Sequence, residues 1–441
     1  MEKKQSLLED YGAKPVPKDQ GKGWFGIGIV YWGIAVCLPA FLIAGMIAGP
    51  TKLGIAIGAF ILGATILGIV SILMGVIGAH TNLSTGLTAR YTFGKVGANV
   101  LQIVLFFAAW GWFGVQLGFM ASGFGNGGLA YVFGGKVPIW VIEIIGGTLM
   151  TLTATLGYKA IEKLSIIAIP LLLIAIIATI ISLYSKDGVT LAKVANTTGK
   201  GAMAFGAAVS VVISSFIMGS LITPDVTRYA KNKKAGAFGM AFGMIVGFPV
   251  VLILGGIMVK GSGGEFDFSR VMLNNNSGIW VSFAIISIIL AAWTTNDNNL
   301  YSGALSINAM FPKLKKWMIT VASGVIGTLL ALWGINTSKG FTSFLSLLAV
   351  IIPPAAGVII LDYYFFKGEE NKFFDPAKLD EVPNIRIIPF VAWIIGTAFG
   401  FIIQKTALKL TGIVALDTIL IAGVAYIIIM LATKHRIKLQ S

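Results

Sequence analysis

Six consecutive polar residues, Thr294 to Asn299, interrupt an apolar stretch of the chain in the segment WTTNDNNLYSG. Polar groups at membrane depth are costly and usually face a cavity or a partner. The adjacent hydroxyls of Thr294 and Thr295 offer two uncharged oxygen ligands to a hard monovalent cation, and carbonyls freed in a broken helix could supply the rest. These hydroxyls could also bond to carbonyls of their own helix. The length of the polar run favours a sodium site.

Asp297 is the acid within this run, and a carboxyl group at membrane depth can relay protons. It could also cap a helix end or bond to the neighbouring asparagines. Asp225 follows Pro224 and lies close in sequence to Arg228, which we interpret as a structural or gating pair at the inner membrane face. Proton coupling through Asp297 is therefore the alternative to sodium coupling.

A second segment, WGWFGVQ, combines a flat ring with an amide. Trp112 and Gln116 are four residues apart, so they lie on one face of a helix. The amide can donate and accept hydrogen bonds. Phe216 could provide a second stacking face, and such stacking is worth about 1 to 3 kcal/mol per base. Although aromatic residues in membrane helices often only pack or anchor, this set predicts a site for a neutral planar heterocycle.

Several classes of protein are excluded by composition. The chain has a single cysteine, Cys37, and two histidines, His80 and His435, so neither an intrachain disulfide nor a Cys/His zinc cage is available. Neither Cys37 nor His80 has partners at the spacing that an enzyme needs. The net charge of +15 comes from basic residues scattered between apolar runs, which does not suit nucleic-acid binding. No phosphate-binding G-x-x-x-x-G-K-[ST] motif occurs, so uphill transport would need an ion gradient.

The elements that must position these side chains are membrane helices. The chain is 56% hydrophobic and 12% charged, with a mean hydropathy of +0.87. Spanning a bilayer takes about 20 apolar residues, and the sequence predicts twelve such spans. Their expected limits are Trp24–Gly49, Leu53–Ala79, Val96–Phe124, Pro138–Leu156, Ile161–Tyr184, Ala202–Leu221, Ala235–Val259, Gly278–Ala304, Trp317–Ile335, Phe341–Phe365, Ile387–Ile403 and Thr411–Leu431.

Two of these spans contain helix-breaking residues. The first has Gly33 and Pro39 near its middle, and the sixth has Gly206, Gly219 and Pro224. Breaks in spans one and six indicate two inverted repeats of five helices with the substrate at the breaks. We expect the first repeat at 24–184, the second at 185–365, and two further spans at 387–431.

The loops predict the orientation in the membrane. Lys and Arg are concentrated in alternate loops. This pattern predicts that the protein lies in the cell (inner or plasma) membrane with both ends of the chain on the cytoplasmic side. Cytoplasmic segments are then expected at 1–23, 366–386 and 432–441. The first of these lacks the apolar core of a removable signal peptide.

Five motifs distributed over nearly the whole chain resemble the nucleobase:cation symporter family, which includes cytosine permeases and hydantoin transporters. They are WTTNDNNLY, GWFGV, TGLTARYTFG at Thr85–Gly94, PDVTRY at Pro224–Tyr229 and IIPPAAGVIILDYY at Ile351–Tyr364. The resemblance implies an all-α, LeuT-like fold with ten core helices in two inverted repeats and two peripheral helices. It also implies import of a nucleobase by sodium symport and alternating access.

The resemblance also implies which residues form the sites. It places the substrate ring between Trp112 and Phe216, with Gln116 and the polar face of the eighth span at its edges. Around the ring it adds Cys37, Ala109, Met218, Asn296 and Asn299. Its sodium ligands would be the carbonyls of Gly33, Val36 and Ala291 and the hydroxyls of Thr294 and Thr295.

This chain departs from the cytosine permeases at three of these positions. In the cytosine permeases that the chain resembles, a glutamine occupies the position of Ala109 and a serine that of Met218. The position of Ala291 is often an asparagine in those permeases. Gln116 instead resembles the hydantoin transporter pattern. We expect cytosine as the substrate, with purines, uracil, hydantoin and allantoin as alternatives. Apart from the substrate, the ion and membrane lipid, no partner is expected.

Overall fold

The computed structural model describes residues 11, 14–124, 137–156, 158–186, 188–265, 268–367, 374–406, 408 and 410–438. Most of the predicted amino-terminal segment, the middle of the 366–386 loop and the last residues of the tail lie outside these. The described residues are helical apart from loops and one isolated bridge between Lys22 and Ala230. Helices satisfy their own backbone hydrogen bonds, which the interior of a bilayer requires.

Within the described ranges, twelve helical units account for the apolar segments. In chain order they are α1 (Trp24–Ala35) with α2 (Leu38–Ala48), α3 (Leu53–Thr81), α5 (Ala98–Gly123), α7 (Ile139–Ala154), α8 (Tyr158–Tyr184), α10 (Phe205–Leu221) with α11 (Pro224–Thr227), α12 (Lys233–Met240) with η3 (Ala241–Gly247) and α13 (Phe248–Gly261), α15 (Ile279–Met310), α16 (Lys316–Leu332), α17 (Ser338–Leu361) with η4 (Asp362–Lys367), α18 (Ile387–Lys405) and α19 (Val414–Lys438). Shorter helices connect them: η1 (Lys18–Gln20), α4 (Thr85–Phe93), α9 (Leu191–Ala195), α14 (Phe268–Asn274) and η5 (Pro376–Glu381).

The lengths of these units fit a membrane protein. Among the described residues, nine helices are long and apolar enough to cross a bilayer, and the bent pair α1–α2 makes a tenth span. The apolar helices α7 and α16 are shorter, with 16 and 17 residues. A helix of that length measures about 25 Å, slightly less than the hydrocarbon core of about 30 Å. The predicted count of twelve spans is consistent with this inventory.

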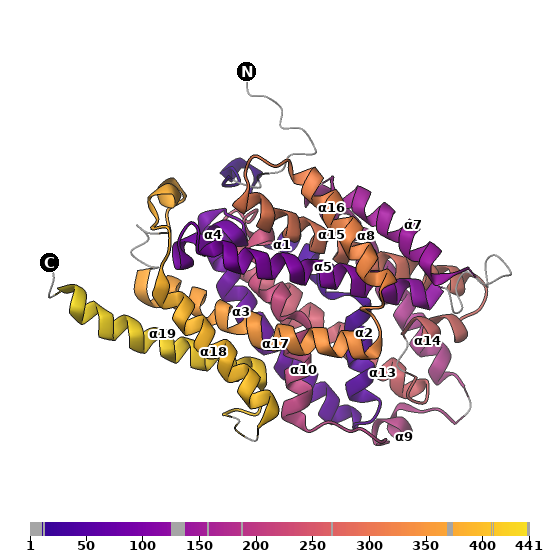
Figure 1. The fold of residues 1–441 in the computed structure, drawn as a ribbon. Helices are drawn as coiled ribbons and strands as arrows, with labels where there is room; N and C mark the ends of the chain where they lie inside the picture. Colours follow the sequence, from indigo (N-terminus) through magenta and orange to yellow (C-terminus); the bar gives the residue numbers. More distant parts are fainter. Residues whose placement is uncertain are drawn as a thin grey trace.

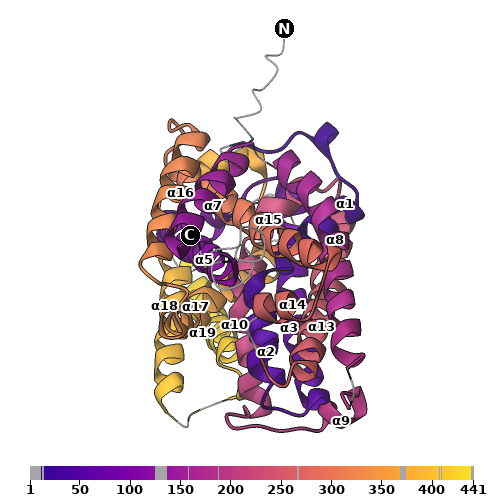
Figure 2. The same cartoon turned by 90° about the vertical axis from the view of Figure 1, so that its right-hand side faces the viewer.

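The packing of the ten core helices follows a two-fold pattern. The first span, α1, packs on α12 and α8, and the sixth span, α10, packs correspondingly on α3 and α17. Similarly, α5 packs on α16, whereas α15 packs on α7. Two inverted repeats related by a pseudo-two-fold axis require these equivalent pairs. In Figures 1 and 2, α10 and α15 lie near the middle of the molecule.

The last two helices lie outside this core. Figure 1 shows α18 and α19 side by side at one edge of the molecule, next to α17. A buried ion pair attaches them: Arg386 Nη1 lies 2.6 Å from Asp362 Oδ2, and the Tyr426 hydroxyl donates to Asp362 Oδ1 at 2.5 Å. Burial alone would lower the pKa of Arg386, but the hydrogen bond and charge of Asp362 raise it above its usual value. The guanidinium therefore stays charged.

Candidate functional site

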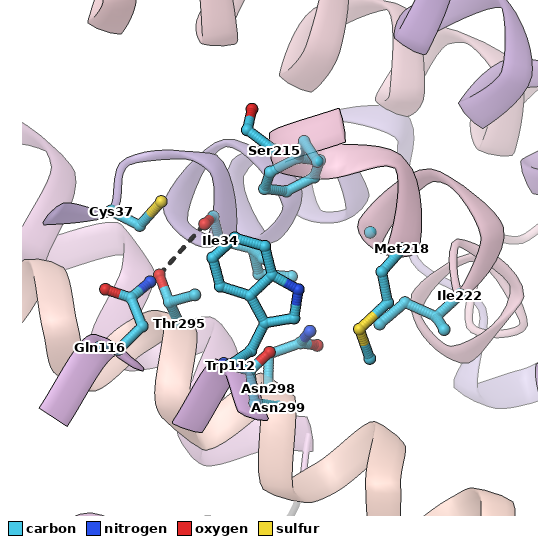
Figure 3. Close-up of a pocket in the computed structure, with 12 residues that line it drawn as sticks. Ile34, Cys37, Trp112, Gln116, Ser215, Met218, Ile222, Thr295, Asn298 and Asn299 are labelled. Carbon is cyan, nitrogen blue, oxygen red and sulfur yellow. Dashed lines mark hydrogen bonds between the residues drawn. The ribbon is translucent and has the colours of Figure 1, made fainter. Parts of the chain in front are cut away.

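A small cavity, with about 30 Å³ of space accessible to water, lies where the broken first span meets α5, α10 and α15 (Figure 3). Its walls consist of Ile34, Cys37, Trp112, Gln116, Ser215, Phe216, Met218, Gly219, Ile222, Thr295, Asn298 and Asn299. Four separate helical units thus contribute side chains to one enclosed space.

The break in the first span creates one wall of this cavity. Helix α1 ends at Ala35, α2 begins at Leu38, and the two axes differ by 61°. Pro39 stands at the start of α2, where its missing N–H costs nothing but where it cannot continue the preceding helix. Cys37 between the two helices is extended, with φ −127° and ψ 156°. As a result, the last carbonyls of α1 are directed toward other helices.

Helix α5 contributes the flat ring and the amide. Trp112 and Gln116 lie on the same face, and the Trp112 indole extends into the cavity in Figure 3. The Gln116 side chain is fully buried, and apart from the Cys37 thiol, a weak partner beside it, neither its Oε1 nor its Nε2 has a hydrogen-bond partner within the described residues. Buried polar groups are normally paired. This amide is therefore available to a bound molecule or to water in the cavity.

Helix α10 contributes the opposite wall with Ser215, Phe216, Met218 and Gly219. Contacts with two rings fix the position of Phe216: its centroid lies 6.1 Å from that of Tyr31 in an edge-to-face arrangement and 5.3 Å from that of Phe248. The Tyr31 hydroxyl also donates to the Gly219 carbonyl and lies 3.1 Å from Thr223 Oγ1. The first and sixth spans are thereby held together beside the cavity.

The polar run of α15 points in three directions. Thr294 and Thr295 face α1, and Asn298 and Asn299 face the cavity. The Asn296 amide donates to the Phe113 carbonyl at 3.2 Å, away from the cavity.

Asp297 faces α7, where its Oδ1 accepts a hydrogen bond from Thr153 Oγ1 at 2.7 Å. It does not line the cavity.

Several neutral oxygens converge at the junction of α1 and α15. Thr294 Oγ1 lies 3.2 Å from the Gly33 carbonyl, and Thr295 Oγ1 lies 3.1 Å from the Ile34 carbonyl and 3.2 Å from that of Ala291. These are hydrogen-bond distances, so each hydroxyl can donate to one of these carbonyls, and no carboxylate is part of this set. Val36 follows the last residue of α1, and its N–H donates to the Trp32 carbonyl.

Asp225, in α11, and Arg228, which follows α11, lie at the end of the sixth span, and both are buried. Asp225 Oδ1 accepts from the Thr85 backbone N–H at 2.8 Å, which ties it to the start of α4. The Arg228 guanidinium donates to the Tyr301 hydroxyl at 2.5 Å and to the Tyr11 carbonyl at 2.6 Å. These contacts join α11, α4, α15 and the amino-terminal segment on one side of the cavity.

The structure brings together most of the residues singled out from the sequence. Trp112, Gln116, Phe216, Met218, Cys37 and Asn299 all line the cavity. Two do not: Asn296 bonds to α5, and Ala109 is buried on the side of α5 that packs against Gly303.

Sequence reasoning missed Ile34, Ser215, Ile222 and Asn298. Asn298 lies within the polar run and could have been included on that signal, whereas the other three carry no special pattern.

Comparison with known proteins identifies the family. Residues 15–428 match the family described as permease for cytosine/purines, uracil, thiamine, allantoin. The cytosine permease of Escherichia coli (strain K12) is 29% identical over 427 residues, which are 95% of this chain and 94% of that protein. The hydantoin permease of Microbacterium maritypicum is 23% identical over 405 residues, covering 85% of this chain and 79% of that protein.

Solved structures show the same fold. The nucleobase-cation-symport-1 family transporter Mhp1, in a closed conformation with bromovinylhydantoin bound, has a TM-score of 0.83 at 19% identity, covering 96% of this chain and 95% of that one. A Na+-coupled sialic acid symporter in an outward-open state has a TM-score of 0.72 at 12% identity, covering 96% and 91%. The expected all-α, LeuT-like architecture is confirmed. The chain belongs to the family of permeases for cytosine and purines, uracil, thiamine and allantoin, and is a multi-pass membrane transporter and not an enzyme.

Proposed function

We propose that this protein imports a neutral, planar nucleobase, with cytosine as the leading candidate, by sodium symport. The observation that carries this proposal is the Gln116 amide, which is buried beside Trp112 in the central cavity with no protein partner among the described residues other than the Cys37 thiol. A site built to bond an amide edge leaves its own polar groups unpaired until that edge is bound.

The substrate ring would lie between Trp112 on α5 and Phe216 on α10. Gln116 would then bond one edge of the ring, and Asn298 and Asn299 on α15 would bond the other. Each of these amides offers a donor and an acceptor, so they match the edge of cytosine, where the exocyclic amine donates and the ring nitrogen and the carbonyl oxygen accept. None of these groups is charged, which favours a neutral substrate.

The choice of cytosine is supported by the family and by one relative, the Escherichia coli cytosine permease. Met218 lines the cavity and adds an apolar contact rather than a hydroxyl. Purines, uracil, hydantoin and allantoin share the planar amide edge and are the alternatives.

Sodium would bind between α1 and α15. Its ligands would be the carbonyls of Gly33, Val36 and Ala291 and the hydroxyls of Thr294 and Thr295. The Thr294 hydroxyl lies 3.2 Å from the Gly33 carbonyl, and that of Thr295 lies 3.2 Å from the Ala291 carbonyl and 3.1 Å from the Ile34 carbonyl. Ile34 and Thr295 belong both to this junction and to the cavity wall. An ion that fixes α1 against α15 would therefore order one wall of the substrate site, and by linkage the substrate would raise the affinity for the ion.

The direction of transport follows from the proposed orientation. With both termini in the cytoplasm, as the distribution of Lys and Arg predicts, the inward sodium gradient of the cell membrane would drive import.

The stacking role is tested by replacing Trp112. We expect Trp112→Ala to weaken binding of every planar heterocycle about 5- to 150-fold, because stacking contributes about 1 to 3 kcal/mol. Trp110→Ala is the matched control: Trp110 lies two residues away on the same helix, packs against Phe106 and is absent from the cavity wall. Calorimetric titration measures the affinity of both purified variants for the heterocycle. Unchanged affinity in Trp112→Ala would contradict the stacking model.

A further inference from the structure

A groove runs along a face of α15 that does not border the substrate cavity. It consists of two adjoining hollows, with about 530 Å³ and about 360 Å³ of space accessible to water. The first hollow lies between α15, α7 and α8, and the second between α15, α7 and the end of α5. Ile289 and Trp293 line both hollows, so the two are continuous. None of the described residues of this groove lines the substrate cavity.

The groove has an exposed apolar rim and a covered floor. Ile145 on α7, Ile167 on α8 and Ile286 on α15 are exposed, whereas Met150 and Phe124 are almost completely covered. An apolar hollow does not hold ordered water, and an empty hollow forfeits the packing contacts of its lining. In a membrane protein, the apolar material that reaches such a groove from the bilayer is a lipid chain.

The length of the groove matches one acyl chain. Its lining extends along α7 from Val141 to Thr153 and along α15 from Ile285 to Asp297. Each stretch rises about 18 Å, at about 1.5 Å per residue. One leaflet contributes about 15 Å to a hydrocarbon core of about 30 Å. The groove can therefore hold one chain over its full length.

A basic side chain lies at one end of the groove. The charged residues among its described lining are Lys163, near the start of α8, and Asp297. Asp297 is 1% exposed, and its Oδ1 accepts a hydrogen bond from Thr153 Oγ1 at 2.7 Å. Lys163 is exposed, and a lysine near a helix end extends its ammonium group to the membrane interface. The charge that this end presents to a lipid headgroup is therefore positive.

The predicted orientation places this end at the cytoplasmic surface. Lys163 follows the connection between α7 and α8, which the distribution of Lys and Arg assigns to the cytoplasm. The cytoplasmic leaflet has a negative surface potential because it contains anionic lipids. Charge and position therefore favour an anionic headgroup from this leaflet.

We propose that the groove binds one anionic phospholipid of the cytoplasmic leaflet. The phosphate group pairs with the Lys163 ammonium, and one acyl chain passes Trp293 and Ile289 to reach the second hollow beside α5. Trp293 Nε1 donates to Thr153 Oγ1 at 2.7 Å, which fixes the indole as a flat surface where the hollows join. The bound lipid packs α15 against α7 and α8. This site does not depend on which substrate or ion the protein transports.

A groove-filling variant tests the path of the chain. Ile289→Trp places a larger side chain where the two hollows join, and Ile394→Trp is the matched control, because Ile394 is exposed on α18 outside the groove. Native mass spectrometry of the purified protein, titrated with phosphatidylglycerol or with phosphatidylcholine of the same chains, counts the bound lipids. We expect the wild type and Ile394→Trp to retain one phosphatidylglycerol and Ile289→Trp to lose it. Equal retention in the two variants, or a dimer that excludes lipid, would overturn the proposal.

A charge variant tests the headgroup. We expect Lys163→Gln to lower the affinity for phosphatidylglycerol about fivefold, as one basic residue near an anionic membrane surface contributes, and to leave that for phosphatidylcholine unchanged. Lys313→Gln is the control, because Lys313 is exposed between α15 and α16 and does not line the groove. If Lys163→Gln and Lys313→Gln bind phosphatidylglycerol equally, or if the wild type does not distinguish the two lipids, the proposed headgroup contact is wrong.

Photolabelling of the wild type gives a readout that does not depend on folding of any variant. The probe is a phosphatidylglycerol with a photoreactive diazirine near the end of one acyl chain. We expect the label in peptides of α7 between Val141 and Leu149, which line the second hollow. A label spread evenly over the exposed faces of α16 and α18 would show that lipid contacts this protein without a dedicated site.

Discussion

The buried amide of Gln116 leads to an unusual prediction about stability and affinity. Replacing it by methionine, which has a similar length and shape, removes two polar atoms that have no partner in the described protein apart from the Cys37 thiol. We expect Gln116→Met to weaken substrate binding while leaving the substrate-free protein as stable as before, or more stable.

The magnitudes follow from hydrogen-bond energies. A typical hydrogen bond contributes about 0.5 to 1.5 kcal/mol net, so two bonds to the substrate amount to about 1 to 3 kcal/mol, or about 5- to 150-fold in affinity. An unpaired buried polar group costs about 1 to 3 kcal/mol in the empty protein. The variant avoids that cost, although water in the cavity reduces the gain.

The assay combines two measurements on purified protein. Calorimetry gives the substrate affinity, and thermal unfolding without substrate gives the stability. Gln102→Met serves as a control in the same helix, because the Gln102 amide is bonded to the Gly86 carbonyl at 2.7 Å and its loss should lower stability without contact to the cavity. If Gln116→Met loses stability as Gln102→Met does, or retains full affinity, Gln116 is a packing residue and the proposed substrate site is wrong.

Two further predictions concern the ion and the peripheral helices. Thr295→Val removes a hydroxyl from the α1–α15 junction and should weaken sodium binding about 10- to 150-fold, because a bond to a charged group is worth about 1.5 to 3 kcal/mol. Titration of the purified variant with sodium measures this loss of affinity. Thr148→Val is the control, because Thr148 is exposed and its hydroxyl bonds to the Ile144 carbonyl of its own helix. Equal sodium affinity in both variants would refute the ligand role. Arg386→Met leaves Asp362 buried without its cation and should cost about 3 to 5 kcal/mol of stability, and the double variant with Asp362→Leu should recover most of this loss. Thermal unfolding measures both, and an unchanged melting temperature in Arg386→Met would show that the pair does not anchor α18 and α19.

The helices were largely predictable because a bilayer imposes a common length and forbids unpaired backbone. The first span breaks at Val36 and Cys37, between the Gly33 and Pro39 from which the break was expected. In the sixth span the interruption falls at Ile222 and Thr223, just before Pro224, whereas Gly206 lies in the first turn of α10.

The π-helical segment Ala241–Gly247 of the seventh span was not predicted. Within it, Gly243 and Gly247 pack closely against Tyr31 and Trp32 of α1, a tertiary contact. The spacing of these glycines, four residues apart with Gly239 before them, is typical of closely packed membrane helices and could have indicated this contact.

The polar run of α15 shows where sequence reasoning on the site ends. Successive residues of a helix are rotated by about 100°, so six consecutive polar residues must face several neighbours. Polarity alone did not distinguish Asn298, which lines the cavity, from Asn296, which bonds to the Phe113 carbonyl. That distinction depends on which helix packs on each face, which follows only from the assembled fold.

The most direct test of the central claim is a calorimetric titration of purified protein with cytosine, uracil, purines, hydantoins and allantoin, in sodium and with choline replacing sodium. The proposed function predicts that one of these heterocycles, cytosine first, binds in sodium and loses most of its affinity in choline. Binding that is equal in sodium and choline would contradict sodium coupling, and no binding of any of these compounds would contradict the proposed substrate class.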